Sequence, residues 1–85
     1  MIKLINDLEN LDFEDKRATK KILQNIENDI LFWQKRNNKS QLKKLSGLLA
    51  NFASINSKGV YHSSGKRKFI DNIFFLVSKC EYFMR

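Results

Sequence analysis

The sequence predicts an all-α fold, a small antiparallel bundle of four helices. Breakers of regular structure are scarce, because the 85 residues include no proline and only three glycines. Apolar residues recur at helical spacing in four segments, and the apolar fraction of 42% is enough for a small core. Residues 1–85 are therefore expected to form a single helical domain. A three-helix domain with a short N-terminal helix is the alternative arrangement.

The first expected helix is short and acidic, and the second is long. Residues at helical spacing in the first are Leu4, Ile5, Leu8 and Leu11. Asp12 is expected to open the second helix, because Glu14 and Asp15 would then place carboxylates at the positive end of the helix dipole. The apolar stripe of this helix consists of Ala18, Ile22, Ile26, Ile30 and Trp33. Residues 35–37 are expected to close it with two cations.

The third helix is expected to begin near Ser40, a residue type that caps helix N-termini. Its apolar face consists of Leu42, Leu45, Leu49 and Phe52. Residues 56–59 predict its end, with Gly59 available for a left-handed turn. A loop containing Val60, Tyr61 and His62 is then expected to run to about Gly65.

The fourth helix is expected over residues 66–84, with more than half of its circumference apolar. The predicted core contains Ile22, Ile26, Ile30, Leu45, Leu49, Phe52, Ile73 and Val77, and Trp33 is expected to be half-buried. The apolar excess indicates either the central helix of the core or a surface, including Phe75 and Tyr82, that is left exposed for a partner. A membrane span is not expected, because the unbroken apolar run over residues 73–77 is far below the ~20 residues required.

The charge distribution predicts an anionic partner. The formal net charge is +7, and no acidic residue falls between Asp29 and Asp71. The candidate contact residues are Lys58, Lys66, Arg67, Lys68, Phe75 and Tyr82. Cations in the first turn of the fourth helix oppose its dipole, so residues 63–68 are a candidate anion site, with a solvated basic loop as the alternative. The spacing is not that of a P-loop, because Val60 stands where that motif has glycine.

Catalytic, cofactor and metal sites are not expected. His62 has no acidic neighbour in sequence to orient its ring, and a metal site needs more ligands than His62 and Cys80. Cys80 lies on an apolar stripe and is expected to fill the core. A single cysteine fits a reducing cytoplasm, and the first ten residues do not read as a signal peptide.

Nucleic acid is a second candidate partner on charge alone. The cations are spread over several elements, however, and no helix carries the pattern of a recognition helix. Tyr61 and Trp33 are too few for a stacking platform. A small basic nucleic-acid-binding protein, or an inhibitor that occupies a partner's nucleic-acid groove, remains the alternative reading.

Over about residues 4–80, the chain resembles the immunity proteins of class IIa (pediocin-like) bacteriocins, of the enterocin A and mundticin group. A short acidic helix precedes a long one that ends in basic residues. The third helix opens with Leu42-Lys-Lys-Leu45 and Leu48-Leu49. A Lys58-Gly59-Val60 turn then leads through a polar loop into a lysine-rich start and the apolar stretch over residues 69–77.

This resemblance implies a cytoplasmic, antiparallel four-helix bundle that is not an enzyme. Such proteins protect the producing cell from inside, in connection with the mannose phosphotransferase permease that the bacteriocin uses as its receptor. The C-terminal half is implied to select the bacteriocin, and here that half includes Lys58, the cations over residues 66–68 and the fourth helix. We also expect a monomer, with an anionic inner membrane surface as a further contact.

Overall fold

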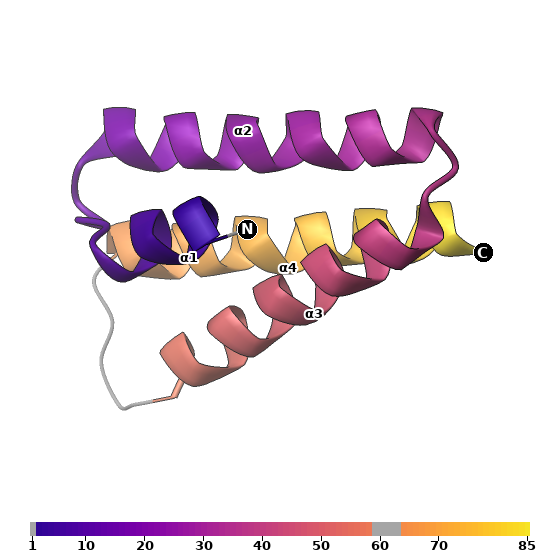
Figure 1. Ribbon diagram of the computed structural model, residues 1–85. Coiled ribbons are helices and arrows are strands. Elements are labelled where there is room, and N and C mark those ends of the chain that lie inside the picture. Colours follow the sequence, from indigo (N-terminus) through magenta and orange to yellow (C-terminus); the bar gives the residue numbers. More distant parts are fainter. Residues whose placement is uncertain (1, 59–63) are drawn as a thin grey trace.

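The computed structural model describes residues 2–58 and 64–85 and confirms the all-α fold (Figure 1). The helices are α1 (Ile2–Glu9), α2 (Lys16–Lys35), α3 (Lys39–Asn56) and α4 (Ser64–Met84), and no strand occurs within the described ranges. α2 and α4 run in the same direction, and α3 runs in the opposite direction (Figure 1). The four helices form a small bundle: three long helices pack on one another, and short α1 lies over the side between α2 and α3.

α2 begins at Lys16, four residues later than the sequence predicts. The Asp12 side chain accepts a hydrogen bond from the Glu14 N–H (3.0 Å), which holds this segment in a turn. Asp15 is the N-cap, and its carboxylate accepts the Ala18 N–H at 3.1 Å. Glu14 and Asp15 therefore precede the helix, and its first turn contains cations and no acid.

The connection from α2 to α3 is built by two asparagines. Asn37 adopts a left-handed conformation with φ of 54°, which asparagine tolerates better than most residues. The Asn38 N–H donates to the Trp33 carbonyl (3.0 Å), and its side chain accepts the Gln41 N–H (3.1 Å). Asn38, not Ser40, is thus the N-cap of α3. The predicted turn at Gly59 lies outside the described residues.

One hydrophobic core joins all the helices. Its buried apolar residues are Leu8, Ile26, Ile30, Leu42, Leu45, Leu49, Ala53, Phe69, Ile70, Ile73, Leu76, Val77 and Cys80. Six of the eight predicted core residues belong to it, and the other two, Ile22 and Phe52, are partly buried and pack against it. Trp33 is half-buried, as expected, and packs edge-on against Phe32 with ring centroids 4.7 Å apart.

The core predicts a strong contrast between two positions of α3. Leu49→Ala should lower the free energy of unfolding by about 2–5 kcal/mol, because Leu49 is fully buried and its removal leaves a cavity. Ile55→Ala is the matched control: its side chain is exposed, and we expect a change within about 0.5 kcal/mol. Urea denaturation followed by circular dichroism measures both. Equal losses in the two variants would contradict this assignment of the core.

Candidate functional site

The structure brings some of the predicted contact residues together and separates others. Lys68 and Phe75 of α4 line one groove between α2 and α4. Tyr82 is exposed two turns further along α4, on the same face as Phe75, and it packs edge-on against Phe83. Lys58 is exposed after the end of α3, and Arg67 is exposed on α4. Phe75 and Tyr82 are exposed as predicted, whereas the basic residues do not form one site.

The start of α4 contains a contact that the sequence did not predict. α4 begins at Ser64, so Gly65 lies in its first turn and not in the preceding loop. A methyl group on Gly65 would lie 2.6 Å from the Phe13 carbonyl oxygen and 3.0 Å from Oε1 of Glu14. The Glu14 carboxylate therefore approaches the positive end of the α4 dipole, a position that favours a negative charge. The candidate anion site at this helix start already faces an anion of the same chain.

Aromatic contacts hold the segment before α2 on α4. The Phe13 ring packs edge-on against the Phe69 ring, with centroids 5.6 Å apart. The ring of Phe52, in α3, also packs edge-on against Phe69, with centroids 6.2 Å apart. Nζ of Lys66 lies 5.5 Å from the Phe13 ring centroid, which is within the range of a cation–π interaction. Lys66 is half-buried, so it belongs to this packing more than to an open surface.

The groove between α2 and α4 has a volume of about 690 Å³. Its apolar lining includes Leu23 from α2 and Phe69, Phe75 and Leu76 from α4. Three lysines also line it: Lys16, Lys20 and Lys68. Sequence reasoning missed the first two, because it assigned the opening of α2 to acidic residues. The one available signal was their i, i+4 spacing, which places both on one helix face.

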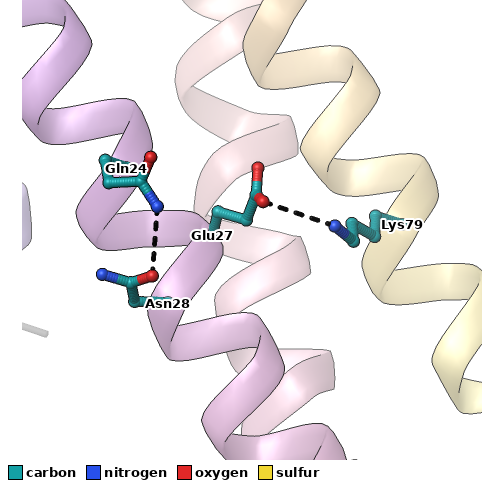
Figure 2. A network of polar contacts seen from close by, with 4 residues as sticks. All are labelled: Gln24, Glu27, Asn28 and Lys79. Atoms are coloured by element: carbon teal, nitrogen blue, oxygen red, sulfur yellow. Dashed lines mark hydrogen bonds and ion pairs between the residues drawn. The ribbon is translucent and has the colours of Figure 1, made fainter.

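The groove ends at a contact between the two helices that form it. Nζ of Lys79 lies 3.7 Å from Oε1 of Glu27, and no other ion pair occurs within residues 2–58 and 64–85 (Figure 2). One turn before Asn28, the Gln24 amide donates to the Asn28 side-chain oxygen at 3.1 Å. Both groups of the ion pair are partly exposed, so we assign it at most about 1 kcal/mol of stability.

A second basic surface lies where α2 meets α3. We call it the basic corner; it comprises Lys35, Arg36, Lys39, Lys43 and Lys44, all exposed. The Arg36 guanidinium stacks over the Phe32 ring at 3.6 Å from its centroid. None of these cations forms an ion pair with another residue that the structure describes.

The described residues include one buried thiol and no cluster of metal ligands. Burial, and secondarily the charge of Glu81, raises the pKa of the Cys80 thiol to about 11, so this thiol stays protonated near neutral pH. Within the described ranges, no group of three or more histidine, cysteine or carboxylate side chains lies close enough to hold a metal ion. His62 lies outside these ranges. None of the described helices is long and apolar enough to cross a membrane.

Comparison with protein-family models, with curated proteins and with solved structures finds no match.

Two glycines test the contact between Glu14 and α4. Gly65→Ala should lower the free energy of unfolding by about 1–3 kcal/mol, because the new methyl group meets the Phe13 carbonyl. Gly47→Ala, within α3, should raise it by about 0.5–1 kcal/mol, because no atom lies within 4 Å of the added group and alanine favours a helix. Thermal unfolding of both variants measures whether each substitution lowers or raises the free energy of unfolding. Stabilisation by Gly65→Ala would show that the Phe13–Glu14 segment does not pack on α4.

Proposed function

We propose that this chain is an immunity protein against a pediocin-like bacteriocin and that it acts by binding a partner, not by catalysis. The proposed site of action is the cytoplasmic face of the membrane, at the mannose phosphotransferase permease with its bound bacteriocin. The helix order supports this proposal, because a short acidic α1 followed by three long helices matches the arrangement on which the resemblance rests.

One observation carries the proposal further: two of the three large aromatic side chains that α4 leaves exposed are about two-thirds exposed, on the helix that contributes most to the core. Phe75 is 66% exposed and Tyr82 is 67% exposed. They are seven positions apart, so they lie on one face of α4 about 10 Å apart along its axis. Burying such a side chain against a partner contributes about 1.5–3 kcal/mol, which is a large contribution for two residues. An exposed aromatic pair on a rigid central helix is well placed for such a contact.

The charge of the protein fits an anionic inner membrane surface beside the permease. Each cation near such a surface contributes about 1 kcal/mol of attraction, and the basic corner presents five of them without a described ion-pair partner. Electrostatic attraction of this kind would concentrate the protein near the membrane, while the aromatic pair on α4 would supply the specific contact.

The basic corner also supports nucleic-acid binding as a second candidate function. Its exposed cations include three lysines on one part of α3, where phosphate groups can approach without a neighbouring carboxylate. A filter-binding assay with duplex and single-stranded DNA at low salt tests this candidate directly. Binding that weakens linearly on a plot of log affinity against log salt, and that is lost in a Lys39→Gln/Lys43→Gln/Lys44→Gln variant, would favour it over immunity.

The immunity proposal predicts that the aromatic pair is required for protection. We expect expression of the chain in a pediocin-sensitive strain to raise the inhibitory concentration of at least one bacteriocin from a class IIa panel. Phe75→Ala/Tyr82→Ala should remove most of this protection while changing the free energy of unfolding by only about 0.5 kcal/mol, because both residues are exposed.

Ile55→Ala is the control for this experiment, because it shortens an equally exposed apolar side chain on a different helix. It should protect as well as the unmodified chain. Failure of the unmodified chain to protect against any member of the panel would contradict the proposed function.

A further inference from the structure

We propose that the groove between α2 and α4 binds an acidic amphipathic helix of a partner protein. This inference deepens the proposed function and rests on its claim that the chain acts by binding. It assigns the part of that contact around Phe75 to a particular surface and gives the chemistry of the segment that occupies it.

The shape of the groove fits a short helix. Its α2 side runs from Lys16 to Glu27, which corresponds to about 16 Å or three helical turns. The two helices that form the groove, α2 and α4, are straight and run side by side in the same direction (Figure 1). Of the apolar lining of the groove, Phe69 and Leu76 are buried in the core, and the half-buried Leu23 and the exposed ring of Phe75 are left for contact. Apolar residues at i, i+3, i+4 and i+7 of a docked helix would cover this lining.

The charges of the groove select an acidic occupant. Each of its two carboxylates already has a positive neighbour: Glu14 lies at the start of α4, and Glu27 pairs with Lys79. The lining lysines Lys16, Lys20 and Lys68 form no ion pair with any residue that the structure describes. The groove therefore presents three unmatched positive charges toward one end. Carboxylates one turn apart on the docked helix would face Lys16 and Lys20, which are themselves one turn apart.

Other anionic partners fit this groove less well. A flat lipid surface reaches exposed lysines but does not enter the groove between two helices, where the half-buried Leu23 lies. A nucleic-acid strand carries phosphates along its whole length, whereas the unmatched lysines are confined to the end where α2 and α4 begin. An amphipathic helix satisfies the apolar lining and the charged end together.

Two synthetic peptides test the proposal. The first is an amphipathic helix of about 18 residues, with leucine on one face and glutamate on both flanks, since much shorter isolated helices are marginal in water. The second carries lysine in place of each glutamate. Fluorescence anisotropy measures their affinities for the full chain. Amide shifts in NMR spectra locate the bound peptide.

We expect the acidic peptide to bind and the basic one to bind at least about tenfold more weakly, because complementary charges discriminate between partners. The amide shifts should cluster on residues 16–27 and 68–79. Lys16→Gln/Lys20→Gln/Lys68→Gln should weaken binding by about tenfold, as expected for the loss of three rim charges. The control Lys39→Gln/Lys43→Gln/Lys44→Gln removes the same net charge outside the groove and should change affinity by about twofold or less.

Phe75→Ala should also weaken the acidic peptide, whereas Tyr82→Ala should not, because Tyr82 does not line the groove. Several results would overturn the proposal: no binding at millimolar peptide, equal affinity for both peptides, shifts on α3, or equal losses in the two lysine variants. The last part of the experiment measures binding of the chain to phosphatidylglycerol vesicles. If they bind the chain through Lys16, Lys20 and Lys68 while the peptide does not bind, the lysines serve a lipid surface and the proposal is wrong.

The protection assay separates failure of this inference from failure of the proposed function. Full protection by the groove variant Lys16→Gln/Lys20→Gln/Lys68→Gln would leave the immunity proposal intact and remove the groove from it. Peptide binding in the groove, without protection by the unmodified chain, would leave the groove as a docking site and remove the immunity proposal.

Discussion

The burial of α4 is the constraint on which the rest of the structure depends. Its buried residues are Phe69, Ile70, Ile73, Leu76, Val77 and Cys80. α2 and α3 pack against it from two sides, and the Phe13–Glu14 segment closes over its first turn. Since α3 returns antiparallel to its neighbours, α2 and α4 begin at the same end of the molecule. This topology brings Lys16 and Lys20 close to Lys68, although about fifty positions separate them in the chain.

The same constraint leaves a surplus of apolar surface. α4 is apolar over more than half of its circumference, but two neighbouring helices and one segment cover only part of it. Phe74, Phe75 and Tyr82 remain exposed. A small domain has a net stability of only about 5–15 kcal/mol, and these rings contribute little to it while they face water. In the proposed function, these rings contact a partner.

Local sequence patterns were sufficient for the helices and most of the core, because apolar periodicity directly reports which face of a helix is buried. They were insufficient where side chains compete for backbone groups. Asp12 and Asp15 both favour helix starts, and only the hydrogen bonds of the folded chain show that Asp15 caps α2. Asn38, and not Ser40, caps the N-terminus of α3, because the left-handed Asn37 turns the chain directly before Asn38.

The candidate sites depended on contacts between distant parts of the chain. The cations over residues 66–68 were recognisable from the sequence, but the approach of Glu14 to Gly65 was not, since it depends on how the segment before α2 folds over α4. The groove required the parallel orientation of α2 and α4, and no local pattern encodes it. The exposure of Phe75 and Tyr82 was one of the two interpretations of the apolar excess on the fourth helix, and the structure shows it.

Native-state hydrogen exchange tests the central role of α4 most directly. Amides of residues 69–80 should exchange only through global unfolding, together with those near Ile30 and Leu49, because all of them lie in the shared core. Amides of α1 should exchange sooner by local opening, since Leu8 is the one residue of that helix in the buried set. Exchange of the α4 amides ahead of those in α2 and α3, or equal protection of α1, would contradict a fold organised around α4.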